Sequence, residues 1–400
     1  MKVLVADKFE KVGLEGLKAL GCEVLNEPDL NGETLQARVK ESGAEILIVR
    51  STKVPREVIE GSKLAVIIRA GAGYNTIDVE AASQLGVRVA NCPGKNSIAV
   101  AELAFGLILS ADRRIPDNVI QLREGKWNKK EFSKARGIYG STLGLVGMGA
   151  IGQEMMIRAR AFGMKVVAYS RWMTPEVAAH LGISMANTVE DLASRCDVIS
   201  VHVALTPKTK GMLGKAFFEA MRPGSIFINT SRAEVVDQAA MEAATKEKNI
   251  FCGLDVFEGE PATGEGVYEG SLRTNPRVYT THHIGASTEQ AQEAIAAETV
   301  RIVREFKNSG DVPNVVNVTK GPAATHVLVV RHYDKDGVLN HTFEALTADG
   351  VNVQEIEKII LSGARAAIAQ IAVDRKITEE GMTRIRKHPD VLDASQMENS

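Results

Sequence analysis

Three side chains that could act together in catalysis each follow a short apolar run in the second half of the chain. Arg232, Glu260 and His283 stand shortly after three such runs, which are typical of strands buried on both faces of a parallel sheet. In open parallel sheets, ligands bind beyond the carboxyl ends of the strands. We therefore expect these three side chains to converge on one crevice.

The three residue types suit the reduction of a ketone that carries a carboxylate. A histidine can donate a proton near neutral pH, and a carboxylate beside it can hold the ring and stabilise the imidazolium. An arginine fork can grip a substrate carboxylate and polarise the carbonyl that receives hydride. A lone arginine is usually a surface cation, and the adjacent His282 shows that one histidine indicates little. The joint arrangement favours a catalytic set of Arg232, Glu260 and His283.

A glycine-rich turn predicts a dinucleotide site. The pattern Gly147-Met148-Gly149-Ala150-Ile151-Gly152 follows an apolar run and opens a predicted helix over 150–163. Its glycines permit a tight turn, a close approach to a pyrophosphate, and close packing of the helix on the strand. The helix N-terminus would add free N–H groups and a partial positive charge. A glycine turn without a ligand is the alternative, which this strand–turn–helix context disfavours.

The second strand of that unit ends in Ser170 and Arg171, where NAD-binding sheets usually carry an acidic residue. A hydroxyl and a guanidinium would accept a 2′-phosphate better than an aspartate would. This indicates NADP as a second cofactor beside NAD. In the alternative interpretation, Arg171 is a solvated loop residue and NAD binds.

Apolar runs alternate with helical patterns up to a turn-rich boundary at 308–314, which predicts an α/β fold with open sheets covered by helices. Beyond the boundary the order becomes strand, helix, strand, strand, helix, strand, typical of a separate α+β unit. The later α/β runs suffice for a complete dinucleotide-binding sheet, and they lie at 142–147, 165–169, 198–201, 225–229, 251–255 and 278–280.

Composition excludes several classes of protein. The formal net charge is -2, from 48 basic and 50 acidic residues, and no basic face for nucleic acid is indicated. Four scattered cysteines without a CxxC pair argue against disulfides and a metal site, and favour a reducing cytoplasm. The first residues lack the long apolar segment of a signal peptide, and the apolar stretch at 98–111 is too short to span a membrane. We therefore expect a cytoplasmic protein with no membrane or nucleic-acid partner.

Several motifs resemble the D-isomer-specific 2-hydroxyacid dehydrogenases over about residues 1–320. They are RAGAGYNTID at 69–78, GMGAIG at 147–152, NTSR at 229–232, LDVFEGEP at 254–261 and THHIGAST at 281–288. The resemblance implies that Arg232, Glu260 and His283 are catalytic. It also implies that Asp255 binds the nicotinamide carboxamide and that the amides of Ala72 and Gly73 bind the substrate carboxylate. Further cofactor contacts are expected from His202, Thr206, Ser231 and Gly285.

The same resemblance implies the domain layout. A Rossmann-like nucleotide domain over 96–285 would be inserted into a flavodoxin-like substrate domain made of 1–95 and 286–318, both with doubly wound parallel sheets. The active site would lie between them, and the βαββαβ unit over 325–400 resembles an ACT domain. Family members pair through the nucleotide and C-terminal domains, so the resemblance implies a homodimer or homotetramer.

Within the family, residues 50–54 and 91–97 are similar to the 3-phosphoglycerate dehydrogenases of L-serine biosynthesis. Arg50 would contact the substrate phosphate, beside Ser51 and Asn96, unless Arg50 is a surface cation. The Ser170-Arg171 pair keeps open an NADPH-preferring hydroxypyruvate or glyoxylate reductase. A third alternative, a non-catalytic corepressor-like protein that senses NAD(H), is disfavoured by the complete catalytic set.

The C-terminal unit has residues where serine-sensing ACT domains have their pocket. His332, Asp334 and Asn352 match those positions, so an amino-acid effector such as L-serine is an expected partner. However, Asp334 stands where an asparagine is usual, and a common proline is missing near Lys335. The alternative is a module that serves only oligomerisation.

Overall fold

The computed structural model describes residues 1–261, 265–319 and 324–399. Its contacts divide the chain into two compact units, Met1–Asn317 and Val318–Ser400. The first unit contains two parallel sheets and the second an antiparallel sheet. These α/β and α+β classes agree with the sequence. The division of the first unit at 95 and 286 remains a prediction.

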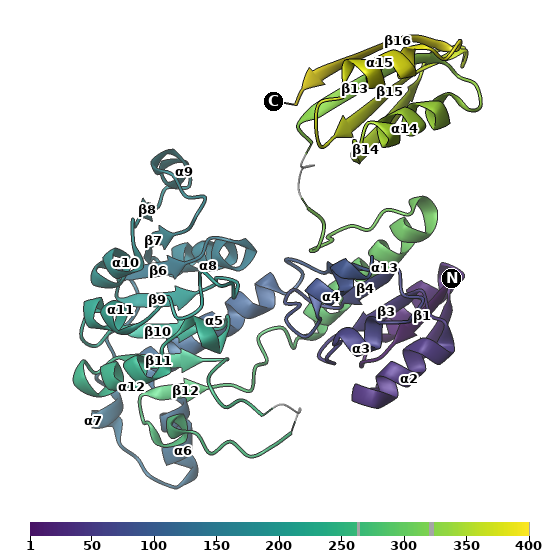
Figure 1. Cartoon of the computed structure of the whole chain (residues 1–400). Coiled ribbons are helices and arrows are strands. Elements are labelled where there is room, and N and C mark those ends of the chain that lie inside the picture. The colour runs from purple at the N-terminus through teal and green to yellow at the C-terminus, as the bar shows by residue number, and fades with distance from the viewer. Residues whose placement is uncertain (262–264, 320–323, 400) are drawn as a thin grey trace. The chain divides into compact units, whose positions relative to one another are not determined.

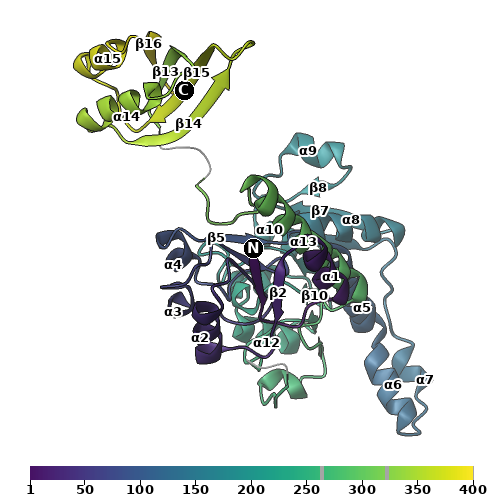
Figure 2. The ribbon, with the colours of Figure 1, turned by 90° about the vertical axis from the view of Figure 1, so that its right-hand side faces the viewer.

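The first sheet is parallel, with the strand order β2-β1-β3-β4-β5. Its strands are continuous apolar runs because both faces are covered. One face packs on α2, α3 and α4, and the other on α1 and α13, as Figures 1 and 2 show. The bounds are β1 Lys2–Val5, α1 Lys11–Ala19, β2 Glu23–Asn26, α2 Gly32–Ser42, β3 Ile46–Val49, α3 Arg56–Ile59, β4 Val66–Arg69, α4 Val79–Gln84, β5 Arg88–Asn91 and α13 Glu289–Ser309.

The second sheet is also parallel, with the order β12-β11-β10-β9-β6-β7-β8, the doubly wound arrangement of dinucleotide-binding sheets. Apolar residues of α5, α8 and α9 pack on one face, and those of α10, α11 and α12 on the other. The bounds are α5 Ser97–Arg113, β6 Thr142–Val146, α8 Ala150–Ala161, β7 Lys165–Tyr169, α9 Pro175–His180, β8 Ser184–Met185, α10 Val189–Arg195, β9 Val198–Val201, α11 Lys215–Ala220, β10 Ile226–Asn229, α12 Gln238–Glu247, β11 Phe251–Leu254 and β12 Val278–Thr280.

Two short helices, α6 (Ile115–Arg123) and α7 (Lys129–Phe132), project from the second sheet (Figure 2). Neither helix contains a buried residue. The chain passes from the first sheet to α5 through residues 92–96 and returns to α13 after β12. Both crossings lie at the carboxyl ends of strands.

The second unit has the predicted βαββαβ order. Its antiparallel sheet has the order β14-β15-β13-β16, and an apolar core lies between the sheet and its two helices. The bounds are β13 His326–Tyr333, α14 Val338–Ala348, β14 Val353–Ile360, β15 Ala366–Val373, α15 Glu379–Arg386 and β16 Val391–Glu398.

The prediction of six strands in the second sheet was too low by one, because the two-residue strand β8 has no apolar run of its own. The predicted helix over 150–163 ends at Ala161 instead. Gly163 then adopts a positive φ of 69°, which glycine tolerates at the end of a helix.

Candidate active site

A cavity of about 970 Å³ lies at the carboxyl ends of both parallel sheets. Thirteen of the predicted site residues line it: Arg50, Ser51, Ala72, Gly73, Asn96, Ile151, His202, Thr206, Ser231, Arg232, Asp255, His283 and Gly285. Glu260 is not part of the lining but contacts His283. These residues therefore surround one cavity at the strand ends, and their roles stay a prediction.

His283 and Glu260 form a hydrogen-bonded pair. Nδ1 of His283 lies 2.8 Å from Oε2 of Glu260, and Oε1 of the same carboxylate accepts the N–H of Phe257 at 2.9 Å. Burial raises the pKa of Glu260, but these hydrogen bonds and the charges of His283 and Arg232 outweigh it and lower the pKa below its ordinary value. Glu260 is thus a carboxylate at neutral pH, and Nε2 of His283 has no partner in the described part of the chain, so it can bind a substrate.

Asp255 holds the loop that carries His283. The buried carboxylate accepts the Thr281 hydroxyl at 2.6 Å and the N–H groups of Ile284 and Gly285, both at 2.8 Å. His283 has a φ of 51°, a left-handed conformation that is unusual for a residue with a side chain. The two backbone bonds to Asp255, directly after His283, stabilise that conformation.

Arg232 is positioned by the turn after β10. The buried Asn229 donates from Nδ2 to the carbonyl of Arg232 at 3.0 Å, and its Oδ1 accepts the N–H and hydroxyl of Ser231 at 2.9 and 2.7 Å. Nη1 of Arg232 donates to the Ser231 carbonyl at 2.6 Å. The guanidinium has no carboxylate partner among the described residues, so it can bind an anion in the cavity.

The glycine turn has the geometry that a dinucleotide requires. A Cβ at Gly147 would lie 2.7 Å from the carbonyl oxygen of His202, and one at Gly152 would overlap the carbonyl of Gly147. Gly149 is exposed at the N-cap of α8, with open space beside it. The first and third glycines are therefore required for packing, while the second leaves room for a phosphate. These residues fit a nicotinamide dinucleotide.

Some of the predicted cofactor contacts line the cavity, and others do not. His202 is half-buried, and its Nε2 lies 2.8 Å from the Ser200 hydroxyl; removal of the ring from water lowers its pKa to about 3. It is therefore neutral. Ser170 and Arg171 directly follow β7 at the carboxyl edge of the sheet but do not line the cavity. Of the turn, only Ile151 lines the cavity; Gly147, Met148, Gly149, Ala150 and Gly152 do not.

The loop after β4 has free backbone donors. Asn91 donates from Nδ2 to the Ala72 carbonyl at 2.6 Å, and the N–H of Cys92 donates to the Gly71 carbonyl at 2.9 Å. In the described part of the chain, the N–H groups of Ala72 and Gly73 have no acceptor. The loop therefore has donors for a carboxylate, the role that the family resemblance implies and that stays a prediction.

The neighbouring loop is held by Asp7, which the sequence analysis missed. Its Oδ2 accepts the N–H groups of Arg50, Ser51 and Thr52 at 2.6, 3.1 and 3.1 Å, and Oδ1 accepts the Ser51 hydroxyl at 3.2 Å. The backbone of this loop is therefore already hydrogen-bonded. Only its side chains, chiefly that of Arg50, remain to bind a ligand.

Arg69 is a second residue that sequence reasoning did not single out. It ends β4 and lines the cavity, and its buried Nε has no hydrogen-bond partner. Burial, together with the charges of Arg232 and Arg50, lowers the pKa of Arg69 to about 10. A methyl group at Gly71 would overlap its guanidinium, so this glycine makes room for the arginine. Within the described residues, no carboxylate pairs with Arg50 or Arg69.

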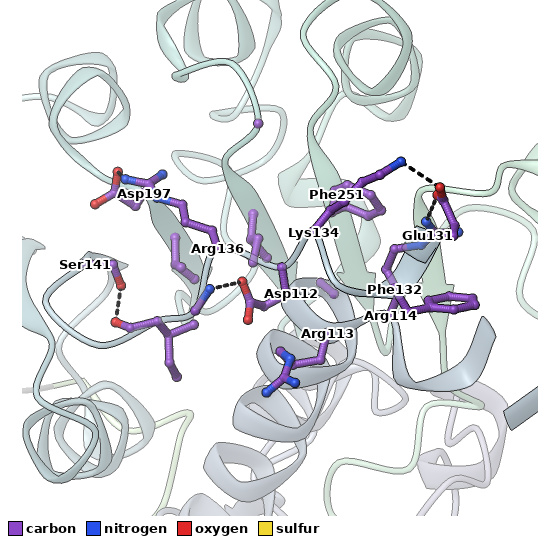
Figure 3. Close-up of a pocket in the computed structure, with 17 residues that line it drawn as sticks. Asp112, Arg113, Arg114, Glu131, Phe132, Lys134, Arg136, Ser141, Asp197 and Phe251 are labelled. Carbon is purple, nitrogen blue, oxygen red and sulfur yellow. Dashed lines mark hydrogen bonds and ion pairs between the residues drawn. The ribbon is translucent and has the colours of Figure 1, made fainter. Parts of the chain in front are cut away.

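A second pocket, of about 250 Å³, lies at the amino ends of strands β9, β10 and β11 (Figure 3). Three of its cations form ion pairs with carboxylates of the same pocket. Glu131 contacts Arg114 and Lys134, both at 2.7 Å, and Asp197 contacts Arg136 at 3.0 Å. The pocket contains none of the predicted site residues, and these cations, unlike those of the larger cavity, already have partners.

In the second unit, the structure separates the predicted effector residues. His332 is buried near the end of β13 and bonds the Tyr333 carbonyl at 2.7 Å, whereas Asn352 precedes β14. Val353, next to Asn352, pairs with Val373 on β15, and Val373 pairs with His326 on β13. His326 lies at the end of β13 opposite to His332. One copy of the unit therefore does not bring His332 and Asn352 together, and an effector site at these residues stays a prediction.

Asp334 is paired in a way that the sequence did not predict. Its carboxylate accepts from Nζ of Lys358 on β14 at 2.6 Å.

Among the described residues there is no cluster of His, Cys, Asp and Glu suited to a metal ion. Nor does any helix in those ranges have the length and apolar character to cross a membrane.

Comparisons with known proteins agree with this geometry. The sequence profile of the D-isomer specific 2-hydroxyacid dehydrogenase NAD-binding domain matches residues 105–285. D-3-phosphoglycerate dehydrogenase of Methanocaldococcus jannaschii is 40% identical over 324 residues, which are 80% of this chain and 60% of that protein. The chain thus spans about 60% of the length of such curated relatives.

Two solved structures extend the comparison. The TT0316 protein from Thermus thermophilus is 33% identical with a TM-score of 0.71, over 79% of this chain and 100% of that one. The NAD⁺-bound 3-phosphoglycerate dehydrogenase of Entamoeba histolytica is 28% identical with a TM-score of 0.66, over 80% and 99% of the two chains. The chain belongs to the D-isomer specific 2-hydroxyacid dehydrogenase family.

Proposed function

We propose that this protein is an NAD-dependent D-3-phosphoglycerate dehydrogenase, which interconverts 3-phosphoglycerate and 3-phosphohydroxypyruvate. The observation that carries the proposal is that three arginines lining the large cavity, Arg50, Arg69 and Arg232, have no carboxylate partner among the described residues. Clustered, partly buried cations destabilise one another, and an anion relieves that cost. A substrate with a carboxylate and a phosphate at its two ends supplies enough negative charge for all of them.

The side chains divide the substrate between two subsites. The Ala72 and Gly73 amides and the Arg232 fork bind the carboxylate and polarise the adjacent carbonyl. Arg50 and Arg69 bind the phosphate. Nε2 of His283 donates a proton to the carbonyl oxygen during reduction and takes it back during oxidation, while Glu260 stabilises the imidazolium.

The cofactor would be held by the turn at 147–152 and by the residues of the second sheet that line the cavity. When bound, NADH supplies the hydride. Use of NADPH would depend on Ser170 and Arg171, which directly follow β7 at the carboxyl edge of the same sheet. Both cofactors belong in the same assay.

The test is steady-state reduction of 3-phosphohydroxypyruvate, hydroxypyruvate and glyoxylate, each with NADH and with NADPH. One charge-assisted hydrogen bond contributes about 1.5–3 kcal/mol, so kcat/KM should favour the phosphorylated acid by roughly 10- to 150-fold. Equal kcat/KM for the unphosphorylated acids would instead identify a hydroxypyruvate or glyoxylate reductase. No turnover of any 2-oxo acid would favour the non-catalytic alternative.

For the second unit we propose an ACT-like regulatory domain in a homo-oligomer. Its βαββαβ order and the unpartnered, buried Nε2 of His332 support a ligand site near the end of β13. Because Asn352 lies at the other end of the sheet, such a site would need the Asn352 of a second copy. Equilibrium dialysis with L-serine, and its effect on kcat and KM, would test this.

A further inference from the structure

The substrate loop after β4 is held from behind by one buried amide. Asn91, at the end of β5, is 8% exposed and donates from Nδ2 to the Ala72 carbonyl at 2.6 Å. The amide thus fixes the peptide whose N–H belongs to Gly73. When the carbonyl of a peptide is fixed on one side, its N–H points to the opposite side. The orientation of this loop donor therefore depends on Asn91.

Asn91 is in turn bonded to a segment more than two hundred residues away in sequence. The N–H of Asn91 donates to the Asn314 carbonyl at 3.4 Å, and Nδ2 of Asn314 donates to the Asn91 carbonyl at 3.3 Å. Asn314 has a φ of 60°, a left-handed conformation that asparagine tolerates better than most residues. In this conformation the backbone carbonyl and the side-chain amide of Asn314 both bond to Asn91.

A buried carboxylate holds Asn314 in place. Oε1 of Glu298, on α13, accepts Nδ2 of Asn314 at 2.7 Å and Nη2 of Arg301 at 2.7 Å, and Oε2 lies 3.3 Å from Nζ of Lys95. The side chain of Glu298 is only 7% exposed. Lys95 belongs to the crossing between the two parallel sheets. Glu298 therefore joins that crossing to the segment that contains Asn314.

This segment leads directly to the second unit. Val315 forms an antiparallel bridge with Ala90, and the N–H of Val316 donates to the Val89 carbonyl at 2.8 Å. Asn317 is the last residue of the first unit. Residues 314–317, the exit segment, are thus an added edge of the first sheet through which the chain leaves that unit.

We propose that Asn314 is a positioning residue for substrate binding, acting through Asn91 on the Ala72–Gly73 loop, so that the exit segment sets substrate affinity. The inference rests on the proposed function only in that this loop binds the substrate carboxylate. The inference connects the exit segment, which leads to the second unit, with the substrate pocket. A displacement of the exit segment would break the two bonds between Asn314 and Asn91 and release the loop.

The test removes the Asn314 amide while leaving its backbone unstrained. Glycine accepts a positive φ, so Asn314→Gly should fold. Loss of a buried hydrogen bond changes equilibria by roughly 2- to 13-fold. We expect KM for 3-phosphohydroxypyruvate to rise by about fivefold, with kcat within about twofold of wild type. The dissociation constant of NADH, from fluorescence titration, should stay unchanged, because the loop is not part of the nucleotide turn.

A matched control exists in the same segment. Asn317 accepts the Val89 N–H at 2.8 Å and donates to the Val87 carbonyl at 2.9 Å, but it has no bond to Asn91. Asn317→Ala should therefore remove the bonds to Val87 and Val89, leave those between Asn314 and Asn91 intact, and not change KM. An equal rise of KM in Asn317→Ala and Asn314→Gly would assign the effect to general destabilisation and overturn the inference.

A readout that needs no substrate separates this inference from the proposed function. Hydrogen–deuterium exchange in residues 70–78 of the full chain should be faster in Asn314→Gly than in wild type and in Asn317→Ala. Unchanged exchange overturns the inference whatever the substrate is. Faster exchange with an unchanged KM also overturns it. If the wild type turns over no 2-oxo acid, the proposed function fails, whereas the exchange experiment still decides whether Asn314 holds the loop.

Discussion

The guanidinium of Arg232 occupies the space in which a side chain at Gly73 would lie. A Cβ on Gly73 would overlap Nη2 of Arg232 and come within 3.6 Å of the Asn75 amide oxygen. Gly73 belongs to the loop after β4, and Arg232 follows β10 in the other parallel sheet. The absence of a side chain at Gly73 therefore lets an arginine from one sheet approach the backbone donors of the other.

Gly73→Ala should displace the Arg232 guanidinium from the substrate carboxylate. We expect KM for the 2-oxo acid to rise and kcat to fall, with kcat/KM down by at least about tenfold, since one charge-assisted hydrogen bond is worth roughly 1.5–3 kcal/mol. NADH binding should be unaffected. Gly106→Ala is the control, because a methyl group there enters open space on α5 and favours the helix. Equal kinetics of the two variants would contradict the assigned contact.

His283→Asn should retain the fold and NADH binding but lose proton transfer. General acid catalysis typically contributes 10²- to 10⁴-fold, so kcat should fall by roughly that factor. Glu260→Gln keeps the shape of the partner and removes its charge, so a smaller loss of about tenfold or more is expected. Steady-state kinetics with NADH fluorescence titration separates these effects. Wild-type kcat in His283→Asn would exclude His283 as the proton donor.

The same rule that found the catalytic set would also have found the missed residues. Arg232 and His283 were predicted because each follows an apolar strand; in a similar way Asp7 follows β1, and Arg69 is the last residue of β4. Arg69 was interpreted only as part of a motif. Only the folded structure shows that its buried Nε has no hydrogen-bond partner among the described residues and that Gly71 leaves space for its guanidinium. A sequence shows where a strand ends but not which charges remain unpaired there.

Other relationships have no signature in the sequence. The bond between Asn91 and Asn314 joins residues whose spacing follows no local rule, and the pairing of Asp334 with Lys358 depends on strand register. The separation of Asn352 from His332 has the same cause, because strand register decides which residues lie level across a sheet. The element types, in contrast, followed from apolar periodicity and glycine placement, which are local properties.

Arg69→Met should remove part of the phosphate subsite and spare the rest of the pocket. Methionine fills a similar volume without charge, so kcat/KM for 3-phosphohydroxypyruvate should fall roughly 10- to 150-fold, and that for hydroxypyruvate much less. Inorganic phosphate as a competitive inhibitor gives a second measure, and its inhibition should weaken in the variant. Arg69→Lys keeps the charge without the guanidinium fork, so its kcat/KM should lie between those of the wild type and Arg69→Met. An equal loss for both acids would place Arg69 at the carboxylate instead.

Glu298 should make stability depend on pH below neutrality. The hydrogen bond from Arg301 chiefly, with those from Asn314 and Lys95, lowers the pKa of Glu298 from 4.5 to about 2 despite burial. A carboxylate whose pKa is lower in the folded state stabilises the fold above its unfolded pKa. That stabilisation should be lost as the pH falls from about 4.5 towards 2. At pH 7 the stabilisation has an upper limit of about 3 kcal/mol. The actual value should be smaller, because water screens the partly exposed Arg301 and Lys95.

Urea unfolding of the wild type and Glu298→Gln at pH 7 and pH 4 measures this contribution. The wild type should be the more stable at pH 7, and the difference in the free energy of unfolding should narrow by about 1 kcal/mol at pH 4, where the unfolded wild type begins to bind the proton. Glu293→Gln on the exposed side of the same helix is the control and should show no such change. A difference independent of pH would mean that Glu298 stabilises the fold by its shape and hydrogen bonds rather than by its charge, and the carboxylate would then not be what holds Asn314 against Asn91.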